Sequence, residues 1–210
     1  MLQRWLWIEA DRYRDEQGRV LSAEDLVRRL CETSKTIHLL LQPRLTVHPR
    51  LAQLTAGSLA TTRIVTARPD DGRIEVLLAM FKMPLGTCLA DNYSSGNSAA
   101  AVDPASGTLG KAIARSLELG RFVRHPDTNG LIEGVELPCW TEAKELVVRA
   151  HGHVEGYYFL GWDVALTADG PLLLEANDSW AAELPQRTHD RPLGAMRFAE
   201  LCEAGFARRS

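Results

Sequence analysis

Residues 155–177 read EGYYFLGWDVALTADGPLLLEAN. It contains two apolar segments, residues 157–167 and 171–176, separated by Ala168-Asp169-Gly170. Apolar, β-branched and aromatic runs that flank a short glycine-containing turn are typical of an antiparallel hairpin. We therefore expect a β-hairpin that ends in Glu175 and Asn177.

Three oxygen-bearing side chains lie on this hairpin: Asp163, Glu175 and Asn177. Glu175 and Asn177 are two residues apart, so a strand points both to the same face. A three-residue loop sets Asp163 opposite Glu175 on that face, whereas a two-residue loop sets it opposite Leu174 and turns it to the other face. Gly170 occupies the third loop position, which favours the three-residue loop.

Two carboxylates and an amide oxygen on one face suit Mg²⁺, which binds few protein oxygens and keeps positions open for water and phosphates. The alternative is a hairpin whose acidic side chains face solvent. The apolar flanks favour the metal, because a carboxylate buried there without a cation or donor is costly. The metal prediction fails if Asp163 turns away from Glu175 and Asn177, or if arginines bind any of the three so fully that no ion fits.

The hairpin resembles the metal-binding hairpin of ATP-grasp ligases, in which an Asp on one strand and a Glu-x-Asn on the next hold Mg-ATP. Other segments resemble, in order, the motifs of the sugar-transfer-associated ATP-grasp group: TTRIVTA at 61–67, DNYSSG at 91–96, AVD at 101–103, HPDTNG at 125–130 and LPCW at 137–140. The resemblance implies an α+β fold, the carboxy-terminal ATP-grasp lobe, with a mainly antiparallel sheet and packed helices.

The same resemblance implies two parts, a partial lid lobe at residues 1–42 and the catalytic carboxy-terminal lobe at residues 43–210. An apolar strand expected at 36–41 would form the hinge between them, where the backbone meets adenine. Before this hinge there is one lysine, Lys35, and no glycine-rich loop. Two alternatives therefore stay open: an enzyme that is complete or is completed by another chain or a second copy, and a truncated remnant.

The resemblance also assigns roles to individual side chains. Arg63 and Lys82 would be catalytic, because they balance charge on the transferred phosphoryl group and the acyl phosphate. The predicted nucleotide contacts are Leu41, Gln42, Arg63, Asp91 and Asn92. From the residues alone, Arg63 could instead form a salt bridge at the sheet edge, and Asp91 and Asn92 could equally well cap a turn.

Two residues need separate interpretation. Lys82 stands where the family often has arginine, so the charge is kept and the two-pronged hydrogen bonding is lost. His125 in the HPDTNG segment either orients a substrate or is a structural hydrogen-bonding partner, and a lone histidine is more often the latter.

Composition is that of a globular protein, with 45% hydrophobic residues and a formal net charge of −3 over 210 residues. No basic excess points to nucleic acid, and no apolar run is long enough to span a membrane. The four cysteines are far apart, so we expect reduced, buried thiols in a cytoplasmic protein.

Outside the hairpin, hydrophobic periodicity predicts further strands and helices. Strands are expected at 61–67, 74–83 and 99–103, and helices after Ser22, at 50–59, at 111–119, after Thr141 and at 195–207.

The implied function is ATP- and Mg²⁺-dependent joining of a small carboxylate to an amine through an acyl phosphate, in cell-surface polysaccharide biosynthesis. The alternative from another class is a non-catalytic ATP-grasp remnant that binds nucleotide or metal, or that acts as an interaction module. The sequence does not name the acid or the amine.

Overall fold

The computed structural model describes residues 5–9, 11–15, 17–39, 43–55, 57–86, 97–116, 118 and 120–207. The predicted nucleotide contacts Leu41, Gln42, Asp91 and Asn92 lie outside these residues. The chain forms two compact units, Met1–Arg44 and Leu45–Ser210. Within the described residues, no helix is both long and apolar enough to cross a membrane.

The first unit is a small antiparallel sheet followed by a helix. Strands β1 (Trp5–Glu9), β2 (Arg12–Asp15) and β3 (Val20–Ser22) pair in chain order and lead into α1 (Ala23–Ser34). The hydroxyl of Ser22 accepts a hydrogen bond from the backbone N–H of Asp25 at 3.1 Å, so the helix begins where the sequence predicts it.

The strand expected at 36–41 is wrong for its described part, residues 36–39. Ile37 and Leu39 are exposed there instead of lying in a sheet. An apolar, β-branched run favours a strand only where another strand is available to pair with it.

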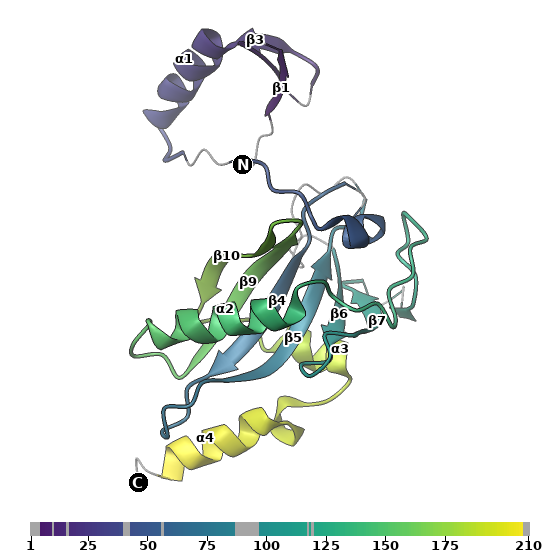
Figure 1. Cartoon of the computed structure of the whole chain (residues 1–210), viewed down its shortest axis with the longest axis vertical. Coiled ribbons are helices and arrows are strands. Elements are labelled where there is room, and N and C mark those ends of the chain that lie inside the picture. Colours follow the sequence, from purple (N-terminus) through teal and green to yellow (C-terminus); the bar gives the residue numbers. More distant parts are fainter. Residues whose placement is uncertain are drawn as a thin grey trace. The chain divides into compact units, whose positions relative to one another are not determined.

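The second unit is built on a seven-stranded sheet with the order β10-β9-β4-β5-β6-β7-β8. Every neighbouring pair in it is antiparallel, which confirms the α+β class with a mainly antiparallel sheet (Figure 1). The strands are β4 (Thr61–Ala67), β5 (Glu75–Met83), β6 (Ser98–Val102), β7 (Leu109–Ala114), β8 (Arg121–Phe122), β9 (Phe159–Thr167) and β10 (Gly170–Asn177).

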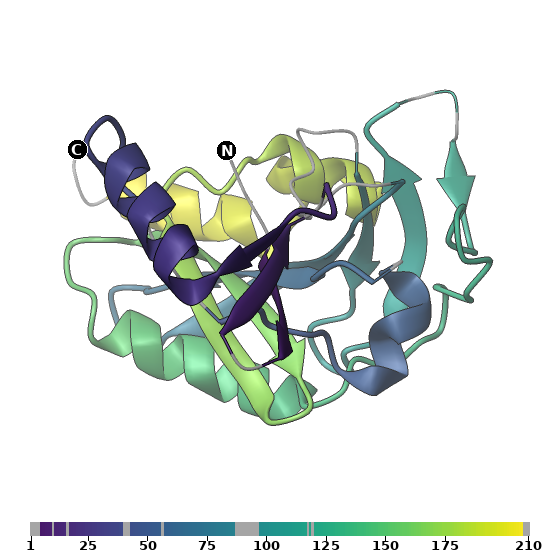
Figure 2. The same ribbon diagram turned by 90° about the horizontal axis from the view of Figure 1, so that it is seen from above.

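Helices cover both faces of this sheet. Figure 2 shows α2 (Trp140–Gly152) on one side and α3 (Glu183–His189) and α4 (Arg197–Ala207) on the other. The larger core lies under α2, where Ala143 and Val147 pack with the sheet residues Ile64, Phe81 and Val164. The unit also contains two short 3₁₀ helices, η1 (Pro49–Leu54) and η4 (Leu193–Ala195).

Three of the predicted helices differ in the structure. Residues 109–114 form β7 and not the start of a helix over 111–119, because pairing with β6 overrides the local preference of an alanine-containing segment. The segment expected as a helix at 50–59 is the shorter η1. Helix α2 begins one residue before Thr141, and Cys139 precedes it with a left-handed φ of 53° and no side-chain cap.

Two further features of the structure differ from what the sequence predicts. The segment after Asn177 contains α3, which has Pro185 in its first turn, where proline is tolerated because that N–H has no helical partner. The described cysteines are not buried thiols: Cys31 is exposed, and Cys139 and Cys202 are half-buried.

Candidate functional site

The β9–β10 hairpin sets Asp163 opposite Glu175, as the metal prediction requires, but by a different route. Gly170 pairs with Thr167, so the turn has two residues and the expected three-residue loop is wrong. A register shift between Leu173 and Glu175 then adds one residue to β10, and this bulge restores the pairing of Asp163 with Glu175.

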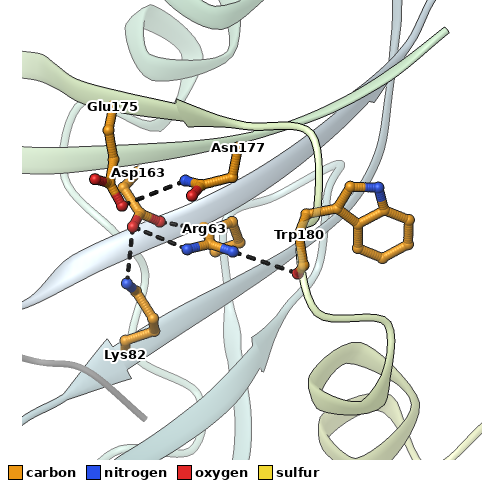
Figure 3. Close-up of polar contacts among 6 residues, drawn as sticks. All are labelled: Arg63, Lys82, Asp163, Glu175, Asn177 and Trp180. Carbon is orange, nitrogen blue, oxygen red and sulfur yellow. Dashed lines mark hydrogen bonds and ion pairs between the residues drawn. The ribbon is translucent and has the colours of Figure 1, made fainter. Parts of the chain in front are cut away.

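Arg63 binds Asp163 from the neighbouring strand. The two residues are directly opposite each other in the β4–β9 pair. Nε of Arg63 donates to Oδ1 of Asp163 at 2.5 Å and Nη2 donates to Oδ2 at 2.9 Å, so the guanidinium grips both carboxylate oxygens (Figure 3). Arg63 therefore forms the salt bridge that the sequence offered as one alternative, but in the third strand of the sheet and not at its edge.

Lys82 reaches the same carboxylate from β5. Its Nζ donates to Oδ2 of Asp163 at 3.0 Å. The side chains of Arg63, Lys82 and Asp163 expose 13%, 8% and 7% of their surface, so this ion-paired group is largely shielded from water. Three adjacent strands, β9, β4 and β5, thus bring two cations onto one buried anion.

The electrostatic balance at Asp163 favours the charged carboxylate. Burial would raise its pKa, but the hydrogen bond from Arg63 and the positive charges of Lys82 and Arg63 outweigh burial and lower the pKa to about 2. Asp163 therefore remains an anion at any physiological pH.

The other two predicted metal ligands lie beside Asp163 on the edge strand β10. Glu175 is exposed and Asn177 is half-buried. Nδ2 of Asn177 donates to Oε1 of Glu175 at 3.3 Å, which leaves the amide oxygen of Asn177 as its remaining acceptor (Figure 3). The structure thus brings Arg63, Lys82, Asp163, Glu175 and Asn177 together.

The donor set fits Mg²⁺, with competition at one ligand. A carboxylate offers about four lone-pair positions. Those of Asp163 accept hydrogen bonds from Nε and Nη2 of Arg63 and from Nζ of Lys82, so one position on Oδ1 is left for an ion. Within the described ranges, no cluster of three or more His, Cys, Asp or Glu side chains could hold a metal. The predicted ligands therefore offer Mg²⁺ the carboxylate of Glu175, the amide oxygen of Asn177 and one position on Asp163.

Trp180 and Gly161 support the site, and the sequence reasoning did not identify either. The carbonyl oxygen of Trp180 accepts a hydrogen bond from Nη1 of Arg63 at 3.3 Å. A β-carbon on Gly161 would lie 2.4 Å from Cβ of Trp180, so only glycine lets this segment cross β9 so closely. The sequence does contain one sign of this contact, which is the glycine at position 161 inside an apolar strand. Such a glycine often marks a close approach of another backbone.

His125 is a structural residue and not part of the group around Asp163. It is buried, and its Nε2 donates to the carbonyl oxygen of Pro84 at 2.9 Å. Its Nδ1 accepts from the backbone N–H of Asp127 at 3.3 Å. Both ring nitrogens are therefore used within the fold, which decides between the two alternatives that the sequence left open.

The family model described as sugar-transfer associated ATP-grasp matches residues 7–196, a range that includes every predicted site residue. No match is found among curated proteins or among solved structures.

Proposed function

Because this chain belongs to the sugar-transfer-associated ATP-grasp family, we propose that it is an ATP- and Mg²⁺-dependent carboxylate–amine ligase. The observation that carries the proposal is the convergence of two largely shielded cations and three oxygen-bearing side chains on adjacent strands of one sheet. That combination suits a magnesium-bound polyphosphate, which presents anionic oxygens and a divalent cation together.

Each side chain has a role in this proposal. Arg63 supplies a planar guanidinium that suits phosphate oxygens, and Lys82 supplies a compact positive charge. Asp163, Glu175 and Asn177 would hold Mg²⁺, which when bound neutralises charge on the β- and γ-phosphates. The resemblance adds Leu41, Gln42, Asp91 and Asn92 as nucleotide contacts.

The proposed chemistry needs no nucleophile from the protein. An oxygen of the carboxylate substrate attacks the γ-phosphorus of ATP, and ADP leaves. The amine then attacks the acyl carbon, and phosphate leaves as the amide bond forms. The protein contributes position and charge balance, which are the main sources of catalysis in phosphoryl transfer. We further propose that one of the two substrates is a precursor of a cell-surface polysaccharide.

Binding of Mg-ATP to the purified chain tests the site. We expect calorimetry to detect binding with Mg²⁺ in excess, and Glu175→Gln to weaken it about tenfold, as for loss of one charged ligand. Glu175 is exposed, so this variant should fold normally. Asp71→Asn, at an exposed turn of the same unit, is the matched control and should bind like the wild type. Absence of Mg-ATP binding in the wild type would contradict the proposal.

Turnover tests the ligase step. Hydroxylamine can replace the unknown amine, so each candidate acid is incubated with ATP, Mg²⁺ and hydroxylamine. Release of ADP together with a hydroxamate, dependent on the acid, identifies an acyl phosphate. Uronic acids and other sugar acids are the first candidates.

A second candidate is an ATP-grasp module that binds nucleotide or metal without turnover. The observation that favours it is the pairing of Asp163 with two cations, because a ligand that is already neutralised binds a metal less strongly. Mg-ATP binding without ADP release across a broad set of acids and amines would support this second candidate.

A further inference from the structure

We propose that Asp163 blocks the phosphate site of this chain until Mg²⁺ and polyphosphate arrive together, so that neither ligand binds well alone. The inference deepens the proposed function and rests on it. It follows from the pairing of Asp163 with Arg63 and Lys82, the two cations proposed to meet phosphate.

A polyphosphate without metal meets cations that are already engaged. Arg63 uses Nε and Nη2 on Asp163 and Nη1 on the carbonyl oxygen of Trp180. A phosphate that took these donors would leave the buried carboxylate of Asp163 without its partners and beside a second anion. Both consequences oppose binding, since an unpaired buried charge and a like-charge contact are each unfavourable.

A metal ion without phosphate meets the opposite difficulty. It would have to share the carboxylate of Asp163 with Arg63 and Lys82, which places two more positive charges beside two cations. Glu175 and Asn177 alone give one carboxylate and one amide oxygen, a small ligand set for Mg²⁺.

The two ligands together allow an exchange of partners. With both present, Asp163 would help to hold the metal, and Arg63 and Lys82 would bind the phosphate oxygens. Every buried charge then keeps an opposite charge beside it, so each ligand removes the obstacle to the other. Binding of this kind is positively coupled, and the coupling is reciprocal.

The test measures binding of sodium tripolyphosphate in EDTA, with the full chain and no nucleotide. We expect Asp163→Asn to bind the metal-free anion at least about tenfold more tightly than the wild type, because Arg63 and Lys82 no longer bind a carboxylate at residue 163. Addition of Mg²⁺ should then improve binding much less in the variant than in the wild type.

Glu175→Gln is the matched control. It removes the same formal charge from the same site, but Glu175 has no hydrogen bond to Arg63 or Lys82 among the contacts of the described residues. A comparable gain in Glu175→Gln would show that net charge alone is responsible and would overturn the inference. Equal metal-free affinity of Asp163→Asn and the wild type would also overturn it.

A second measurement uses the wild type, in case Asp163→Asn does not fold. The ¹⁵N resonance of Arg63 Nε reports the hydrogen bond to Asp163. We expect it to move with tripolyphosphate and Mg²⁺ together and to stay in place with tripolyphosphate in EDTA. Movement with the metal-free anion would contradict the inference. Failure of the proposed function looks different: the wild type would then bind no Mg-ATP, whatever Asp163→Asn does in EDTA.

Discussion

At Gly161, a β-carbon would lie 2.4 Å from Cβ of Trp180 and 3.1 Å from Cδ of Arg63. Gly161→Ala must therefore displace Trp180, whose carbonyl oxygen binds Arg63. We expect the variant to lose about 1–3 kcal/mol of unfolding free energy, as is typical of overpacking. Urea denaturation followed by tryptophan fluorescence measures this loss.

Gly110→Ala is the control for Gly161→Ala. Gly110 also lies within a strand of the large sheet, but a β-carbon there would be 3.8 Å from its nearest neighbour, the carbonyl oxygen of Ala101. This variant should be as stable as the wild type or slightly more stable, because alanine restricts the unfolded chain. Equal stability of both variants and the wild type would show that Trp180 does not depend on Gly161.

The pH dependence of stability should depend on the buried residue His151. Its Nε2 donates to the carbonyl oxygen of Tyr157 at 3.1 Å, so Nδ1 is left to accept from the hydroxyl of Thr66 at 2.7 Å. Burial lowers the pKa of His151, and the nearby charge of Arg68 lowers it further, against the hydrogen bond to Tyr157. Burial likewise lowers the pKa of His189.

These lowered pKa values make acid destabilising. As the pH falls below about 6.5, the unfolded chain takes up the protons first. Above that pH the unfolding free energy keeps the whole contribution of these histidines. Toward pH 5 it falls, by at most about 1.4 kcal/mol per pH unit for each histidine. His151→Gln should reduce this slope, and His153→Gln, at an exposed histidine after the same helix, should not. Urea titrations at pH 7.5 and 5.5 measure both slopes, and an unchanged slope in His151→Gln would refute the prediction.

At the scale of elements, the hairpin shows what sequence can and cannot predict. Glu175 and Asn177 share a face by strand periodicity alone, and the sequence predicts this. The pairing of Asp163 with Glu175 depends on a bulge in β10, and neither the turn residues nor the apolar pattern of Leu172, Leu173 and Leu174 indicates a bulge. The predicted pairing is therefore correct although its predicted cause, a three-residue loop, is wrong.

The contacts of Arg63 and Lys82 show a second limit. The resemblance assigns both residues to the site, but their shared partner comes from strand order. The chain folds so that β9 pairs with β4 and β4 with β5, which joins residues far apart in sequence. Local propensity carries no information about such pairing.

The loop at 125–130 fixes the chain just after β5, which carries Lys82. Oδ2 of Asp127 accepts from the backbone N–H of Gly86 at 2.7 Å, and His125 binds Pro84. Asp127→Ala should speed hydrogen exchange of the Gly86 amide by up to about tenfold, the effect of losing one hydrogen bond. Exchange measured by NMR tests this expectation.

Two variants complete the test of Asp127. Asp127→Asn keeps an acceptor oxygen and should retain most of the protection. Asp71→Ala removes a similar bond, from the backbone N–H of Arg73, at a different turn and should leave Gly86 unaffected. Protection of Gly86 that survives in Asp127→Ala would show that the bond to Asp127 does not fix this segment, which His125 also holds at Pro84 and Asn97 at Leu85.

At the scale of the whole molecule, the chain divides into two compact units, and the residues around Asp163 lie in one of them. The sequence predicts a boundary after residue 42 by family resemblance, and the compact units divide after Arg44. Identification of the first unit as a partial lid lobe stays a prediction. What the structure adds is that Arg63, Lys82, Asp163, Glu175 and Asn177 all belong to the second unit.

A chain of residues 45–210 should therefore fold and keep the phosphate site. The hydrophobic clusters of the sheet contain described residues of the second unit only. In residues 11–44, among the side chains whose burial the structure describes, the buried apolar one is Leu26. We expect the unfolding free energy of the shortened chain to lie within about 0.5 kcal/mol of the full chain, as for changes outside a core. Its affinity for tripolyphosphate with Mg²⁺ should also be unchanged. Urea denaturation and calorimetry on both chains measure these quantities. A shortened chain that folds but binds at least tenfold more weakly would show that residues 1–44 contribute to phosphate binding, as a lid lobe does in the family that the sequence resembles.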